Sequence, residues 1–227
     1  MNFGKVYLKL IKIKLAELTD YQSEVESFLE RKRKESNSEY ATIDWDDIDD
    51  EEYKAFLKDT LAEEYHNYQK YYPNLLRSAI IFQTYSVLEK YLIKLCDFMK
   101  EHKGLSKAVK KSGGAFNNAI TYLTTEFPIN KSELNPEFEF IDCVRLLRNK
   151  ITHENGEVSC SKSNSPKEAR LIKFMLSENS ISTFRDYSDF KKGVEGTYEI
   201  NIISGDLNAK FIAAIEKLFE KIVQRIF

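Results

Sequence analysis

Hydrophobic residues recur every three or four positions over most of the chain, which is the spacing of one face of an α-helix. This spacing predicts helices over residues 51–71, 74–103, 105–127, 137–155 and 206–226, with a shorter helix around Leu171 to Met175. The segment 74–103 is apolar on most sides, so it should lie centrally, covered by several neighbours. The chain is therefore expected to be mainly α-helical.

The N-terminal part gives weaker signals. Residues 1–34 are ambiguous between strand and helix at their start, and we favour a helix up to the basic cluster that ends at Lys34. The polar stretch Glu35 to Asp50 is expected to be a loop whose final carboxylates cap the next helix. Pro73 is expected to end that helix, because the residue before a proline avoids the helical conformation.

One region alternates as a strand does. Tyr198, Ile200 and Ile202 alternate with polar residues, and the sequence from Lys191 to Gly196 supplies a turn, so residues 181–203 are predicted to form a β-hairpin. The Ser-rich and Asn-rich segment 157–166 is expected to be a loop. We therefore expect an N-terminal helical extension (1–72) and a helical bundle with a hairpin insertion (73–227), or both within one compact domain.

Charge and cysteine content narrow the classes of function. A formal net charge of −2 gives no overall attraction to nucleic acid, so RNA or DNA would need a local basic patch. Cys96, Cys143 and Cys160 lack the close spacing of metal sites and are expected to be reduced thiols in the cytoplasm. Lysines interrupt the apolar N-terminus, so no membrane span is expected, and a basic amphipathic surface anchor is the less favoured alternative.

The helix predicted at 137–155 carries the candidate chemistry. Its polar side holds five residues, and Arg148 lies on the flank; the five are Asp142, Arg145, Asn149, Thr152 and His153. A histidine that moves a proton, beside a guanidinium that stabilises phosphate charge, suits RNA cleavage by the 2′-hydroxyl without a metal or other cofactor. From spacing alone, a solvated helix face with a surface histidine is the simpler interpretation.

The sequence LLRNKITHENG, from Leu146 to Gly156, resembles the motif of the HEPN superfamily, in which an arginine, a polar residue, a short spacer and a histidine end a helix. The earlier segment IIFQTYSVLEKYLIKL is similar to that family's preceding core helix. The resemblance covers residues 75–156 and implies an antiparallel helical bundle. It further implies a homodimeric, metal-independent endoribonuclease of host defence or toxin–antitoxin systems, with one composite site for two copies of the motif.

The resemblance also implies roles for individual residues. Arg148 would bind the scissile phosphate, His153 would act as general base or acid, Asn149 would orient His153 or the substrate, and Glu89 would hold the arginine or position a proton. Further RNA contacts are expected from cations near the motif and at the start of the helix 105–127, namely Arg145, Lys150, Lys107, Lys110 and Lys111.

Residues 1–72 and the hairpin lie outside the family's minimal bundle, so they are candidates for regulation, covering the site or recognising a partner such as an antitoxin. The alternative function is a non-catalytic module that uses the same bundle to bind a nucleotide, RNA or a partner protein.

Overall fold

Long helices form the frame of the protein. The structure is a computed structural model that describes residues 3–227. Its main helices are α1 (Phe3–Thr42), α2 (Glu51–His66), α3 (Tyr72–Lys103), α4 (Ala115–Glu126), α5 (Glu137–His153) and α8 (Asp206–Ile226). The smaller elements are η1 (Asn67–Tyr71), η2 (Lys131–Leu134), β1 (Glu157–Cys160), α6 (Pro166–Ser177), β2 (Ile181–Thr183), α7 (Tyr187–Lys192) and β3 (Gly196–Ile202).

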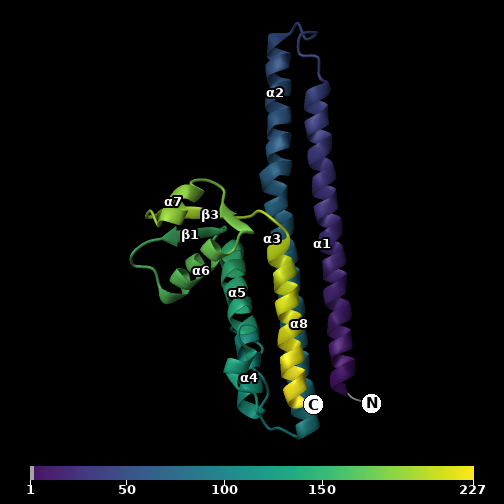
Figure 1. Ribbon diagram of the computed structural model, residues 1–227, viewed down its shortest axis with the longest axis vertical. Coiled ribbons are helices and arrows are strands. Elements are labelled where there is room, and N and C mark those ends of the chain that lie inside the picture. The colour runs from purple at the N-terminus through teal and green to yellow at the C-terminus, as the bar shows by residue number, and fades with distance from the viewer. Residues whose placement is uncertain (1–2) are drawn as a thin grey trace.

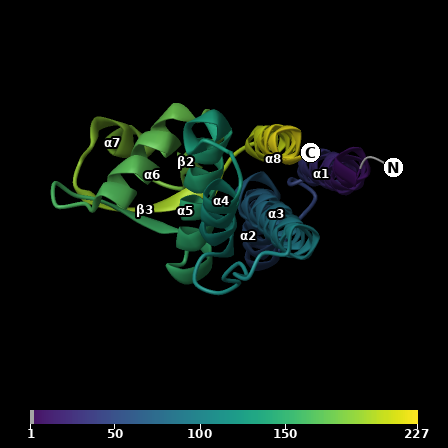
Figure 2. The same cartoon turned by 90° about the horizontal axis from the view of Figure 1, so that it is seen from below.

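The helices pack side by side around α3 and α8. Helix α1 packs against α3 and α8, α5 packs on another side of α8, and α4 lies against α3. The strands, α6 and α7 lie beyond α5, on the side away from α1 (Figures 1 and 2). The outer half of α1 and helix α2 extend past the rest of the molecule as a long projection (Figure 1).

One core joins both halves of the sequence. Helix α3 contributes Leu88 and Leu92, which are completely buried. Ile11 of α1 and Phe211 of α8 pack into the same cluster. Because burial of each such side chain contributes roughly 1.5–3 kcal/mol, this cluster dominates the stability of the fold. The prediction of a mainly α-helical protein with a small β insertion is confirmed.

The expected loop at 35–50 is wrong for its first half, since α1 continues to Thr42, and is confirmed for residues 43–50, which connect α1 to α2. The basic cluster supports this extension through ion pairs along the helix, with Lys32 Nζ 2.7 Å from Glu35 and Lys34 Nζ 2.7 Å from Glu30. The capping prediction is confirmed: Asp50 Oδ1 accepts the backbone N–H groups of residues 52 and 53 at the start of α2. Between residues 30 and 66, which we call the arm, Ser36 and Leu61 are the buried residues.

The prediction that a helix ends at Pro73 is also wrong. Helices α2 and α3 continue into each other through the π-helical turn η1, and Pro73, which has no N–H to donate, follows that turn in the first turn of α3. A π turn displaces backbone hydrogen bonds from their α-helical pattern. Arg33 of α1 donates its Nε–H to the carbonyl oxygen of Tyr68 at 3.0 Å and so stabilises this turn.

The helix expected over 105–127 is shorter, because α4 begins at Ala115. Gly113 and Gly114 have φ values of 69° and 95°, which a right-handed helix does not allow. Lys107, Lys110 and Lys111 therefore lie in the loop before α4 and not on its first turns.

The predicted hairpin belongs to a three-stranded antiparallel sheet in the order β1-β3-β2. Strands β2 and β3 pair, with Ile181 opposite Ile202, but the expected turn is replaced by α7, which Gly193 ends. The expected loop at 157–166 is wrong at its start, since β1 pairs Val158 with Tyr198 of β3. This strand has no signal in its own polar sequence, because pairing with β3 and burial of Val158 stabilise it.

Candidate functional site: the polar face of α5

Helix α5 ends where the sequence predicted a stop. Asn155 and Gly156 both adopt positive φ, at 53° and 76°, and the N–H of Gly156 donates to the carbonyl of Lys150 at 3.0 Å. This end leaves His153 as the last helical residue, with an exposed side chain. The opposite side of α5 is apolar and lies in the core, where Val144 and Leu147 are completely buried.

Asp142 was expected on an open polar face, but it is 5% exposed. Helix α6 packs against α5 and places Arg170 over this carboxylate. Asp142 Oδ1 accepts a hydrogen bond from Arg145 Nε at 2.6 Å, and Oδ2 accepts one from Arg170. Burial favours a higher pKa for Asp142, but the two guanidinium groups outweigh it and hold the pKa below its usual value.

Arg148 lies at the junction of α3 and α5. Its Nη1 donates to Asn149 Oδ1 at 3.1 Å, and its guanidinium carbon lies 5.6 Å from the centre of the Tyr85 ring. The Arg148 Nε is buried and has no hydrogen-bond partner among residues 3–227. Burial raises the pKa of Tyr85, so this hydroxyl stays neutral beside the arginine. The guanidinium therefore keeps donors that residues 3–227 do not use, its Nε among them.

The motif residues are brought together only in part. Asn149 and His153 lie one turn apart on the same face of α5, in line with Arg145. Arg148 points along a neighbouring face toward Tyr85, and in the part of the chain described no hydrogen bond joins it to His153. One protomer thus presents an exposed histidine and a half-buried arginine at the end of the same helix.

Glu89 does not contact the motif through any hydrogen bond that the structure shows. Its carboxylate accepts the backbone N–H of Phe116 at 3.2 Å and so caps the start of α4. It lies near Tyr85, one turn away along α3, and its charge contributes to the raised pKa of the Tyr85 hydroxyl after burial. In this structure Glu89 holds α4 in place rather than holding Arg148.

The lysines expected to contact RNA are in different situations. Lys150 pairs with Glu154 at 2.6 Å and with Glu168 at 3.3 Å, and these carboxylates outweigh burial and raise its pKa. Lys111 pairs with Asp97 at 2.7 Å. Lys107 and Lys110 are exposed in the loop before α4.

A groove of about 760 Å³ runs along α5 between α4 and α6. Its walls include Arg145 and Asn149, which the sequence singled out. They also include cationic residues that sequence reasoning missed: Lys131, Lys167 and Arg170. Lys167 and Arg170 are three residues apart, so the sequence predicts that they share one helix face. Only the packing of α6 against α5 shows that this face lies beside the motif.

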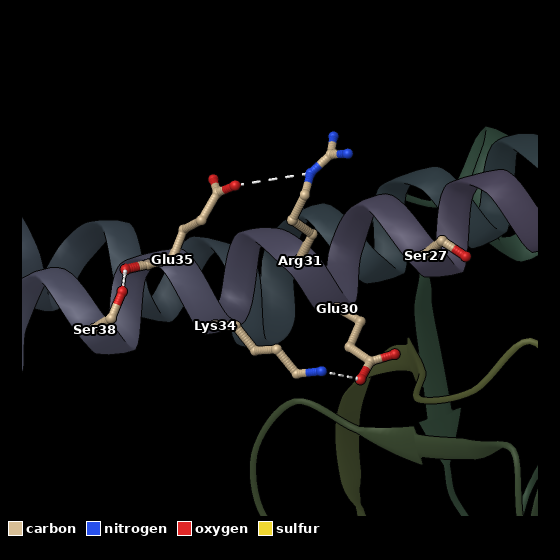
Figure 3. Close-up of a pocket in the computed structure, with 6 residues that line it drawn as sticks. All are labelled: Ser27, Glu30, Arg31, Lys34, Glu35 and Ser38. Atoms are coloured by element: carbon tan, nitrogen blue, oxygen red, sulfur yellow. Dashed lines mark hydrogen bonds and ion pairs between the residues drawn. The ribbon is translucent and has the colours of Figure 1, made fainter.

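A second hollow, of about 530 Å³, lies on the surface of α1 near the base of the arm. Figure 3 shows that all six of its lining residues come from this one helix. Two ion pairs along the helix, Lys34 with Glu30 and Arg31 with Glu35, occupy its charged groups. This hollow has no opposite wall of groups that could converge on a ligand, so we do not treat it as a site.

Other kinds of site find no support within residues 3–227. No group of three or more His, Cys, Asp or Glu side chains is arranged to hold a metal ion there. The same residues include no helix long and apolar enough to cross a membrane. The three cysteines are unpaired, and burial raises the pKa of the Cys96 thiol to about 12, which makes it unreactive.

Comparison of the chain with protein-family models, curated proteins and solved structures found no significant match. The resemblance of Leu146–Gly156 to the HEPN motif therefore stands on those residues and on their place at the end of α5.

Proposed function

We propose that the protein is a metal-independent endoribonuclease that acts as a cytoplasmic defence or toxin effector. The observation that carries the proposal is the end of α5. There an exposed His153 follows Asn149 by one turn, Arg148 keeps an unused donor, and a cation-lined groove leads to Asn149. The unpaired cysteines are compatible with a reducing compartment.

The chemistry needs a base, an acid and a group that stabilises phosphate charge. His153 would remove the proton of the 2′-hydroxyl, whose oxygen attacks phosphorus while the 5′-oxygen of the next nucleotide leaves and takes up a proton. The products are a 2′,3′-cyclic phosphate and a 5′-hydroxyl. Arg148 would turn from Tyr85 toward the phosphate and stabilise its developing charge, with Asn149 orienting His153.

An acid must supply the proton that the leaving 5′-oxygen takes up, and we propose that a second copy of the chain provides it. The sequence has three histidines. His102 stacks on Phe98 near the end of α3, and His66 lies at the end of α2 in the arm. Neither adjoins α5, so the acid would be His153 of a second protomer, in a homodimer with a composite site. An antitoxin or other regulatory protein would then act by covering this surface.

One observation favours the alternative, a non-catalytic module that binds a nucleotide, RNA or a partner protein. Arg148 is bonded to Asn149 and stacked over Tyr85, and it makes no contact with His153. A module of this kind would use the groove for binding and would keep His153 as a surface residue.

The test is incubation of purified protein with end-labelled RNA in excess EDTA, beside His153→Ala and Arg148→Lys. Loss of a general base lowers the rate by about 10²–10⁴-fold, and we expect that loss for His153→Ala. His66→Ala removes an exposed histidine outside the site and should cleave normally. Unfolding curves for all variants separate lost chemistry from lost structure.

The products distinguish the two functions. Cyclic phosphate ends, together with resistance of a matched DNA, would support attack by the 2′-hydroxyl. Cleavage that persists in His153→Ala, or that stops in EDTA, would overturn the proposed mechanism. Intact RNA that is nevertheless bound would favour the binding module.

A further inference from the structure

We infer that the groove between α4, α5 and α6 holds the phosphodiester backbone of single-stranded RNA, with Lys131, Lys167 and Arg170 among its contacts. This inference rests on the proposed function and deepens it, because it assigns the substrate to a surface built largely from residues outside the motif. It also favours Lys131 and Lys167, which have no carboxylate partner among residues 3–227, over Lys150 and Lys111, which carboxylates already neutralise.

The charge of the groove is opposite to that of the chain. Its walls hold four cationic side chains and two acidic ones, whereas the formal net charge of the protein is −2. The cations are Lys131, Arg145, Lys167 and Arg170, and the acids are Glu139 and Asp142. A local excess of positive charge on a slightly acidic protein is the electrostatic pattern that phosphate recognition needs.

The two arginines are held in place by a group that does not use all their donors. Asp142 is almost completely buried and fixes Arg145 through Nε and Arg170 through Nη2, while Nη1 of Arg170 donates to Glu139 at 3.4 Å. The Nε of Arg170 is buried and has no partner within residues 3–227. Because carboxylates fix both side chains before a ligand arrives, little side-chain entropy is lost when phosphate oxygens take the terminal nitrogens of Arg145, which have no partner among residues 3–227.

The opposite wall brings backbone close to the ligand. Gly113 and Gly114 line the groove at the start of α4, and the space beside a Cβ built on Gly114 is open. Helix α4 has no side-chain hydrogen bond from its N-cap residue Gly114. Glu89 already accepts the N–H of Phe116 in the first turn of α4, so this helix start offers close approach to its backbone rather than additional positive charge.

The position of the groove connects it with the proposed chemistry. Asn149 lines the groove, and His153 lies one turn further along the same face of α5, about 6 Å along the helix axis. A backbone that follows Arg145 and Asn149 would therefore reach His153. This order places the cleaved phosphate at the end of the groove.

The lining also indicates which features of RNA are recognised. Its one aromatic residue, Phe138, is 6% exposed, and Lys131 Nζ lies 4.4 Å from the centre of its ring. Bases therefore have no exposed ring on which to stack, unlike in proteins that hold single strands by aromatic platforms. Recognition through phosphates alone predicts weak dependence on sequence and strong dependence on salt.

The test measures binding without cleavage. A fluorescein-labelled oligouridylate is titrated with the His153→Ala protein in EDTA over a series of salt concentrations, and affinity is read from anisotropy. The same background then receives Lys131→Gln with Lys167→Gln, or Thr121→Glu, which adds a carboxylate to the groove wall. All three residues are exposed, so these changes should leave the fold intact.

Each lost phosphate contact makes the log–log salt dependence less steep by about 0.7 for a single strand. We therefore expect a change of about 1.4 for the double lysine variant, and about tenfold weaker binding at low salt for Thr121→Glu. The matched control is Lys173→Gln with Lys90→Gln, two exposed lysines outside the groove. The control should bind like its parent.

The outcomes separate this inference from the proposed function. Weaker binding in the groove variants, with no cleavage by the wild type, would support the groove and overturn the ribonuclease. Cleavage by the wild type with unchanged RNA affinity in the groove variants would overturn the groove and leave the ribonuclease standing. A parent protein that binds no RNA, or that binds oligoglutamate more tightly than RNA through the same residues, would also overturn the inference.

Discussion

Two arginine–carboxylate clusters in this protein differ in how completely their donors are used. In the first, Arg77 of α3 donates Nε and Nη2 to the two oxygens of Glu26 in α1, both at 2.7 Å, and Nη1 to the carbonyl of Ile202 at 3.1 Å. In the second, the oxygens of Asp142 are shared between Arg145 and Arg170 at the wall of the groove. The Arg77 side chain is 6% exposed, against 36% for Arg170.

The difference shows how to separate a structural arginine from one that is ready for a ligand. Every nitrogen of Arg77 has a partner within the fold, and the cluster ties α1, α3 and β3 together. In the second cluster the terminal nitrogens of Arg145 have no partner within residues 3–227, and the cluster borders an open groove. Sequence alone does not distinguish the two, because the partners of Arg77 and of Arg170 lie on other elements of the fold.

The largest expected effect comes from removing the acid of the first cluster. Glu26→Ala leaves Arg77 buried without its counter-charge, and we expect the free energy of unfolding to fall by about 3 kcal/mol. Urea unfolding measures this change. Glu24→Ala, an exposed residue on the same helix, should change stability by less than about 0.5 kcal/mol. Equal stability of the two variants would contradict the structural role of Arg77.

A smaller loss is expected at the second cluster. Asp142→Ala leaves two guanidinium groups without their shared acid, but both are partly exposed and can regain water, so we expect a loss of about 2 kcal/mol. The two arginines would also lose their fixed positions, so RNA affinity should fall together with stability. Tight RNA binding by a destabilised Asp142→Ala protein would show that the arginines need no fixed arrangement.

The same carboxylate should give the protein an acid-sensitive contribution to stability. The pKa of Asp142 in the folded state lies below its ordinary value of 3.8, so the stabilisation is complete above that value and is lost as the pH falls through the lowered pKa. Urea unfolding from about pH 5 down to about pH 2 should show the stability gap between wild type and Asp142→Asn closing toward acid. A gap that stays constant over this range would exclude a lowered pKa.

The smallest effect is expected at Lys150, which was a candidate RNA contact by its place in the motif. Lys150→Gln removes pairs with Glu154 and Glu168 and should cost about 0.5 kcal/mol of stability. Because those carboxylates already neutralise the lysine, RNA affinity should stay within about twofold of the parent. A loss as large as that of the groove lysines would return Lys150 to the binding surface.

Periodicity was sufficient where a segment has its own amphipathic pattern. The hydrophobic spacing predicted the ends of α5 and α8 to within two residues. Gly156 predicted where α5 stops. Periodicity failed where neighbours decide the structure. Strand β1 depends on pairing with β3, and α7 replaces a turn that Gly193 and Gly196 suggested.

The candidate site was predictable only as far as a single helix extends. The line from Arg145 through Asn149 to His153 follows from helical spacing alone. The burial of Asp142 and the contribution of Arg170 depend on α6 folding against α5, which no spacing within α5 encodes. The unused donors on Arg148 and Arg170 likewise follow from three-dimensional packing.

The π-helical turn at Asn67–Tyr71 has a geometric consequence for the arm. A π turn amounts to one extra residue in an α-helix, and each residue of an α-helix turns the chain by about 100°. Deleting Lys70, which is exposed, would restore the α-helical phase and rotate α2 by about that angle relative to α3. Leu61 would then turn out of its buried position. A single residue in the π turn therefore decides which face of α2 points toward α1.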